Sequence, residues 1–242
     1  MTYCVALRLN RGLVFAADTR TNAGVDNIAQ FRKIHYWRKP GERVLVLLTA
    51  GNLSLTQSVV SLLNEQLVER EEEPDAVNFY NVPSMYRAAR LVGDAVRSIR
   101  VIDGPALEAT KTGFSGSFIL GGQIGTEPPR LFQIYSEGNF IEATDETPFF
   151  QIGEHKYGKP ILDRVVRPTT SLEDGRKAVL ISMDSTLRSN LSVGMPLDLL
   201  TIRRNDYRVA TRERIEAGDP AFTAMSEAWS AALRDGFQGL PG

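Results

Sequence analysis

The chain has 242 residues, of which 43% are hydrophobic, and its 28 Lys and Arg nearly balance its 29 Asp and Glu. This size and apolar content predict one globular domain over residues 1–242, and the near-zero net charge argues against a nucleic-acid or anionic-membrane partner. Cys4 is the only cysteine, which excludes an intramolecular disulfide; with no secretory pattern and no run of about 18 apolar residues, a cytoplasmic location is expected.

The first part of the chain predicts two pairs of strands. Apolar and polar side chains alternate over residues 2–9, a turn follows at 10–12, and residues 13–17 return as a second strand. Residues 31–37 and 44–48 form the second predicted pair, separated by the turn-forming residues at 39–42. The chain is therefore expected to open with hairpins.

A helical period replaces the strand period after Gly51. Residues 54–57, with the sequence SLTQ, have the form of a capping box, and apolar residues then fall on one helical face as far as Leu67. A second helix is predicted from Pro83-Ser84 through Ile99, and the acidic segment 69–75 between the two is expected to be a solvated helix end and loop.

The second half repeats this order of strands and paired helices. Strands are predicted at 117–121, 131–135 and 140–143, helices at 157–166 and 171–189, and closing strands at 196–202 and 207–210. Asp219-Pro220 is expected to cap a last helix that runs to Gly236. Blocks of strands alternating with pairs of helices favour an α+β sandwich of antiparallel sheets covered by helices.

Several common catalytic signatures are absent from the sequence. It contains no GxSxG, HExxH, CxxC or GxxxxGK[ST] motif, and His35 and His155 are its only histidines. A hydroxyl nucleophile that needs no histidine therefore becomes the leading candidate. Thr2 is such a residue once Met1 is removed, because its hydroxyl can attack while its α-amino group, with a pKa of about 8, takes the proton.

Four residues in order suggest a family. Thr2 opens a strand, Asp18 ends the next one in FAADTRTNAG, Lys33 lies in FRKIHY, and Gly51 lies in LLTAGN. Together they resemble the N-terminal half of a proteasome β subunit, an N-terminal nucleophile hydrolase. The resemblance implies a four-layer αββα sandwich, Thr2 as nucleophile, Asp18 paired with a buried Lys33 beside it, and the Gly51 N–H as oxyanion donor.

Each residue also has an ordinary reading. Thr2 favours a strand, Asp18 suits a turn, Lys33 would normally be solvated, and Gly51 could be a turn before a helix. Each of these readings is the better one for its residue alone. The order and strand context of all four favour the catalytic reading.

Later segments place the chain nearest to the bacterial Anbu branch of this family, a relative of the HslV peptidase. The matching segments are ADTRTNAG, NIAQFRK, GEHKYGKPILDR and STLRSNLSVG. The last of these departs from the RDSASG-like pattern of many β subunits, because Ser189 stands where the Asp would be, while Ser192 keeps a hydroxyl. Ser189 and Ser192 are predicted to support the threonine amine, and Glu154 and His155 are read as structural.

The resemblance implies a threonine peptidase in a self-assembled ring or related stack of identical subunits. Its substrate would be a peptide or unfolded protein, an ATPase or unfoldase is a candidate partner, and the chemistry needs no metal or organic cofactor. Two alternatives stay open. One is a self-assembling scaffold with little catalysis, favoured by Ser189 and the arginine-rich segment 203–214; the other is a hydrolase of small amides.

Overall fold

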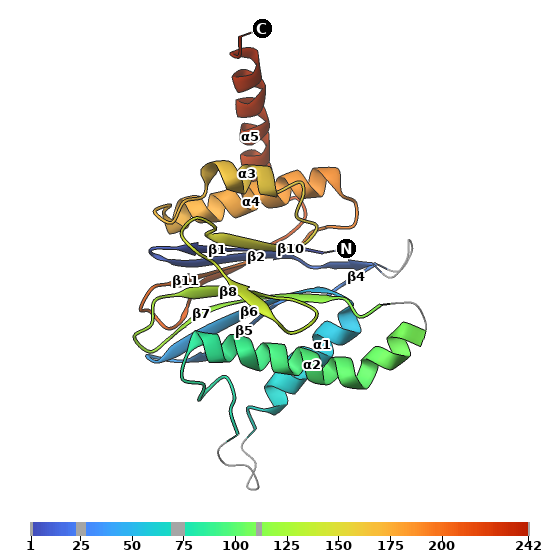
Figure 1. The fold of residues 1–242 in the computed structure, drawn as a ribbon. Coiled ribbons are helices and arrows are strands. Elements are labelled where there is room, and N and C mark those ends of the chain that lie inside the picture. Colours follow the sequence, from blue (N-terminus) through green and yellow to red (C-terminus); the bar gives the residue numbers. More distant parts are fainter. Residues whose placement is uncertain (1, 23–27, 69–75, 110–112, 242) are drawn as a thin grey trace.

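The computed structural model describes residues 2–22, 28–68, 76–109 and 113–241. Two five-stranded sheets, antiparallel at every pairing, lie face to face, and helices cover both outer faces (Figure 1). This arrangement confirms the predicted α+β fold of four αββα layers. The first sheet has the strand order β10-β1-β2-β11-β12 and the second the order β5-β6-β7-β8-β9, while β3 and β4 form a separate pair.

The strands have the following bounds: β1 Tyr3–Leu9, β2 Gly12–Asp18, β3 Arg20–Asn22, β4 Ile28–Gln30, β5 Ile34–Lys39, β6 Arg43–Gly51, β7 Gly116–Ile124, β8 Arg130–Ile134, β9 Phe140–Glu142, β10 Phe149–Gly153, β11 Leu197–Arg203 and β12 Val209–Ile215. The helices are α1 Leu53–Glu65, α2 Met85–Ala109, α3 Lys159–Val165, α4 Leu172–Ser189 and α5 Pro220–Gln238. Helices α1 and α2 cover the second sheet, and α3 and α4 cover the first (Figure 1).

Three apolar clusters pack between the four layers, one at each interface between adjacent layers. Phe15 and Leu48 belong to the cluster between the two sheets. Leu7 and Met183 belong to the cluster between the first sheet and α3 and α4. Because β1 and β2 are buried on both faces, apolar side chains alternate between two cores instead of between core and solvent.

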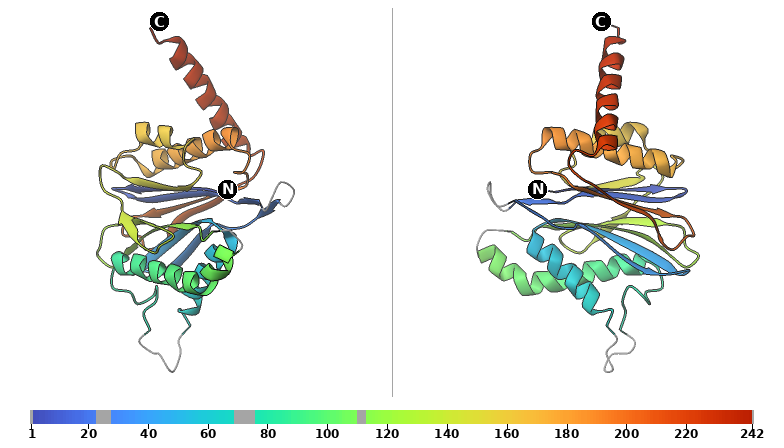
Figure 2. Two further views of the ribbon diagram at one scale, coloured as in Figure 1. Left: turned by 45° about the vertical axis from the view of Figure 1, so that its right-hand side comes forward. Right: turned by 180° about the vertical axis from the view of Figure 1, so that it is seen from behind.

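Helix α5 leaves this layered body and projects from it (Figure 2). Its start is as predicted, since Asp219 accepts a hydrogen bond from the Phe222 N–H at 2.8 Å and Pro220 occupies the first turn. Ser226 is its buried residue, and Leu233 and Phe237 are exposed. No helix in the described ranges is long and apolar enough to cross a bilayer.

Several boundaries differ from the predictions. Strand β10 was not predicted because its two adjacent phenylalanines face different cores, Phe149 toward the helices and Phe150 toward the second sheet, which hides the strand period. The short pair β3 and β4 was also missed. The closing strand predicted at 207–210 is β12, displaced because an edge strand has charged side chains in place of an apolar face.

The N-cap of helix α1 lies two residues before Ser54, the first residue of the predicted capping box. Asn52 is its N-cap, and its side-chain oxygen accepts the N–H of Ser54 at 3.0 Å. The N-cap of α4 is Ser171, whose hydroxyl accepts the N–H of Asp174 at 3.0 Å. The predicted loop at 69–75 lies outside the described residues.

Candidate active site

Thr2 lies directly before β1, which runs between β2 and β10. It is 8% exposed, and its carbonyl oxygen accepts the N–H of Glu154 at 2.7 Å. Gly153 lies against the same carbonyl with φ of +81°, and a Cβ there would come within 1.9 Å of the oxygen. Only glycine permits this approach, so β10 holds the Thr2 backbone in place.

Tyr3 anchors the start of β1 on the helix side of the sheet. Its phenol lies 2.6 Å from the Ser182 hydroxyl and accepts a hydrogen bond from the Gln151 amide at 2.5 Å. Burial raises the pKa of this phenol to about 12. The residue next to Thr2 is therefore held by neighbours from α4 and β10.

Asp18 and Lys33 form a buried ion pair. The Lys33 Nζ donates to Asp18 Oδ1 at 2.7 Å and to the Arg20 carbonyl at 2.6 Å. Asp18 is fully buried and Lys33 is 4% exposed. Since an isolated charge is costly in such surroundings, each side chain needs the other.

Two backbone amides complete the contacts of Asp18. The Tyr3 N–H donates to Oδ1 at 3.0 Å, and the Gly194 N–H donates to Oδ2 at 3.3 Å. Burial raises the pKa of the Asp18 carboxyl above its ordinary value, while Lys33 and these hydrogen bonds oppose the shift. Asp18 thus links Lys33 to the residue that follows Thr2.

Gly51 ends β6 with its amide directed toward this site. On one side of β6 the Thr49 N–H donates to the Lys33 carbonyl at 3.0 Å, and on the other the Asn52 N–H donates to the Ser115 carbonyl at 2.9 Å. Amides alternate sides along a strand, so the Gly51 N–H faces the same side as that of Thr49. Strand β5 begins at Ile34, and Gly51 lies beyond that end.

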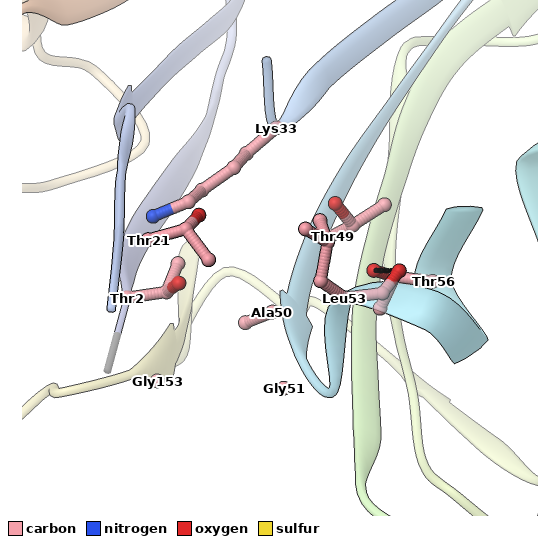
Figure 3. A pocket seen from close by; sticks show the side chains of 9 residues that line it. All are labelled: Thr2, Thr21, Lys33, Thr49, Ala50, Gly51, Leu53, Thr56 and Gly153. Carbon is pink, nitrogen blue, oxygen red and sulfur yellow. Dashed lines mark hydrogen bonds between the residues drawn. The ribbon is translucent and has the colours of Figure 1, made fainter. Parts of the chain in front are cut away.

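A cavity of about 250 Å³ lies between these groups (Figure 3). The Lys33 amino group lies near Thr2 and Thr21, while Gly51 faces Thr2 across the cavity. The residues that line it are Thr2, Thr21, Lys33, Thr49, Ala50, Gly51, Leu53, Thr56 and Gly153. Sequence reasoning missed Thr21, Thr49 and Gly153; Thr21 lies in the quoted ADTRTNAG segment, and Thr49 lies two residues before Gly51.

The predicted supporting residues lie at the end of α4 and just after it. Ser189 is exposed at the last turn of α4, and Ser192, whose N–H donates to Asn190 at 2.9 Å, follows in the next segment. Neither is among the residues that line the cavity. Glu154 accepts a hydrogen bond from the Asn190 amide at 3.0 Å, and the His155 ring lies 3.3 Å from the Gly153 carbonyl oxygen.

The described residues contain no group of three or more His, Cys, Asp or Glu side chains that could hold a metal ion. The site instead combines a hydroxyl, a buried cation and a backbone N–H around one cavity. This set suits acyl transfer, in which a hydroxyl attacks a carbonyl carbon and an N–H stabilises the oxyanion.

The chain matches no protein-family model and no curated protein, but solved structures resemble it over its whole length. Anbu (Gly-1) mutant from Hyphomicrobium sp. strain MC1 is 60% identical, with a TM-score of 0.92, over 100% of this chain and 99% of that one. Anbu (ancestral beta-subunit) from Yersinia bercovieri is 50% identical, with a TM-score of 0.90, over 100% and 99% of the two chains.

A third structure is the helical assembly of the Anbu complex from Pseudomonas aeruginosa. That chain is 50% identical, with a TM-score of 0.92, and the match covers 100% of this chain and 98% of that one.

Proposed function

Because the chain belongs to the Anbu branch of the proteasome-like N-terminal nucleophile hydrolases, we propose that it is a threonine peptidase with Thr2 as its nucleophile. Removal of Met1 would leave the Thr2 α-amino group at the chain end, next to its own hydroxyl. The amine takes the hydroxyl proton, directly or through water, as Oγ bonds to the substrate carbonyl carbon.

Lys33 and Asp18 support the Thr2 amine in this mechanism. The Lys33 cation disfavours a second positive charge nearby, and so lowers the pKa of the amine and keeps it able to act as a base. Asp18 holds Lys33 in place through the 2.7 Å ion pair and holds the Tyr3 N–H at 3.0 Å. A fixed distance between the nucleophile and the cation follows from this shared carboxylate.

Gly51 stabilises the tetrahedral intermediate. Its N–H donates to the oxyanion, and the loss of one such donor typically costs about 3–4 kcal/mol of transition-state stabilisation. As the C–N bond breaks, the leaving amine takes the proton from the Thr2 amine and an ester remains on Oγ. Water then attacks the ester and releases the acid, which restores the Thr2 hydroxyl.

The buried Asp18–Lys33 pair beside Thr2 is the observation that carries this proposal. A lysine that is 4% exposed and paired with a fully buried carboxylate is costly to maintain in a purely structural role. Perturbed, buried charges in a cleft mark candidate functional sites. The supporting role of Ser189 and Ser192 stays a prediction, as do peptide or unfolded-protein substrates and an ATPase partner.

Self-assembly belongs to the same proposal. The Pseudomonas aeruginosa relative is a helical assembly at 50% identity over nearly the whole of both chains. Helix α5 projects from the body with Leu233 54% and Phe237 77% exposed, an apolar surface that suits contact with another copy. We therefore expect a homo-oligomer.

Covalent labelling tests the nucleophile. A threonine-directed electrophile, such as a peptide epoxyketone, should label wild-type protein lacking Met1, as read by intact mass, and should not label Thr2→Ala. Thr126→Ala, which removes an exposed threonine outside the cavity, is the matched control and should label normally. Labelling of Thr2→Ala at the wild-type level would refute the mechanism.

A self-assembling scaffold with little catalysis is the second candidate. It is favoured by Ser189, which supplies no carboxylate where many β subunits have one, and by the exposed apolar side chains of α5. Absence of labelling in wild-type protein shown to lack Met1, together with a defined particle mass, would support it. Preference for a small amide over a peptide would instead favour the third reading, a metabolite hydrolase.

A further inference from the structure

Strand β10 lies at the edge of the first sheet, directly beside Thr2. Among the described strands its ladder partner is β1 alone, with Tyr3 opposite Gly153 and Leu7 opposite Phe149. The other edge of β10 therefore carries backbone groups that do not belong to this ladder. An open strand edge is a template on which an extended peptide can add as a further strand.

The register shows which amides face outward. The Glu154 N–H donates to the Thr2 carbonyl, and the Arg8 N–H donates to the Pro148 carbonyl, each at 2.7 Å. Because amides alternate along a strand, those of Phe150 and Ile152 also face β1, and those of Phe149, Gln151 and Gly153 face the open edge. The outward groups are thus spaced two residues apart, as a peptide strand requires.

A second cavity, of about 540 Å³, follows this edge. Its floor includes residues of β10, and its sides come from β7, β8, α3 and the segment before β10. The residues that line it are Ser117, Gln133, Glu146, Thr147, Phe149, Phe150, Gln151, Ile152, Gly153, His155, Lys159 and Asp163. Polar and aromatic side chains therefore flank the edge, which suits a peptide better than a wholly apolar ligand.

Gly153 joins this groove to the catalytic cavity, because it lines both. Figure 3 shows Gly153 beside Thr2, with Gly51 across the cavity. A peptide whose scissile carbonyl lies between Thr2 and Gly51 extends from the cavity in two directions, and the groove that begins at Gly153 offers room for one of them.

We propose that the leaving-group side of a peptide substrate binds as an added strand along the open edge of β10. This rests on the proposed peptidase function and extends it. The peptide accepts and donates backbone hydrogen bonds at Phe149 and Gln151. When the C–N bond breaks and the new amine takes its proton, the product peptide lies in this groove, separate from the acyl part on Thr2.

The charges of the groove add a sequence preference. Lys159 is already paired, since its Nζ donates to both Asp163 carboxylate oxygens at 2.7 Å. Glu146 lies beyond the end of β10 that is remote from Gly153 and adds a carboxylate there. A basic side chain several residues beyond the scissile bond is therefore favoured over an acidic one.

Amide hydrogen exchange tests the added strand without any turnover. A basic six-residue peptide, corresponding to a leaving-group segment, is mixed with Thr2→Ala protein. We expect at least tenfold slower exchange for the Phe149 and Gln151 amides on binding. No change at saturating peptide would overturn the proposal. Full protection of both amides in the assembly without peptide would also overturn it, because a second copy would then cover the edge.

Charge reversal tests the preference. Peptides ending in Lys or in Glu are compared by fluorescence anisotropy on the Thr2→Ala background with Glu146→Lys added. The Lys-over-Glu preference should fall at least fivefold. Glu216→Lys, at an exposed site after β12 outside the groove, is the matched control and should leave the preference unchanged. Equal effects of both variants would contradict the assignment of Glu146.

The two proposals fail separately. A small threonine-directed electrophile with no leaving-group segment needs only the catalytic cavity. If it labels wild-type protein while exchange of the β10 amides does not change with peptide, peptide binding along β10 is refuted and Thr2 remains supported as the nucleophile. If the amides respond and labelling is absent, the edge binds peptide but the peptidase proposal fails.

Discussion

Asp18→Asn removes one charge from the buried pair and changes little else. The asparagine oxygen can still accept from Lys33 and from the Tyr3 N–H, as Asp18 Oδ1 does at 2.7 and 3.0 Å. Its amide group then faces the Gly194 N–H, which donates to Oδ2 in the native site, so two donors oppose each other. Lys33 then lies 4% exposed without a carboxylate to pair with.

The expected loss of stability is large for this reason. Removal of one partner from a buried ion pair costs about 3–5 kcal/mol. A change of 1 kcal/mol moves the melting temperature of a chain of this length by about 2–4 °C, so a fall of about 6–20 °C is expected. Labelling of Thr2 should also fall, because the Tyr3 backbone and the lysine lose their common anchor.

Differential scanning calorimetry at neutral pH measures the effect, with labelling followed by intact mass in the same samples. Asp198→Asn is the matched control. Its carboxylate pairs with Arg214 through two contacts of 2.8 Å, but the two side chains are 17% and 36% exposed. Such a surface pair should contribute about 1 kcal/mol or less.

The comparison between the two variants tests whether the buried ion pair stabilises the fold and whether it supports the labelling of Thr2. If Asp18→Asn melts within 2 °C of wild type, the ion pair between Asp18 and Lys33 does not stabilise the fold as its short distance and burial indicate. If Asp18→Asn and Asp198→Asn are equally destabilised, burial does not set the strength of the pair. If Asp18→Asn is destabilised and labels at the full wild-type rate, the pair is structural and the proposed support of the amine is wrong.

Two further predictions follow from local geometry. Gly153→Ala should abolish labelling and lower the melting temperature by several degrees, because its Cβ would meet the Thr2 carbonyl oxygen at 1.9 Å. Gly41→Ala is the control, since Gly41 has a similar positive φ of +75° but open space around it, and it should cost only about 1–2 kcal/mol. Equal melting temperatures of the two variants would refute the clash. Burial, and secondarily Arg32, lowers the pKa of His35, so the folded state favours the neutral ring. The free energy of unfolding should therefore fall as the pH drops through about 6.5, the pKa of histidine in the unfolded chain. Urea titrations should show a weaker fall for His35→Gln than for wild type. Parallel pH profiles of the two proteins would contradict this prediction.

Much of the fold could be predicted because strand and helix periods are local. The alternation over 2–9 and 13–17 and the helical stripe from Leu55 are properties of neighbouring residues, and they predicted β1, β2 and α1 in order. Strand β10 escaped because Phe149 and Phe150 are buried on opposite faces, a fact that only the two partner layers reveal.

The candidate site could also be predicted only in part. Thr2, Lys33 and Gly51 were predicted and all three line the cavity, with Asp18 paired to Lys33 behind it. Ser189 and Ser192 match a motif by spacing, and their supporting role stays a prediction. Motif spacing orders residues along the chain, whereas the pairing of distant strands brings Thr2, Lys33 and Gly51 to one cavity.

The sequence alone therefore determined the layered α+β architecture, the family and the four residues of the proposed mechanism, since these depend on short-range period and on matching segments. Only the tertiary structure decided what surrounds them. Gly153 meets Thr2, and Gly194 meets Asp18, across more than 150 residues of chain. Such contacts arise from the pairing of distant strands and the burial of their charges, and a one-dimensional pattern does not contain them.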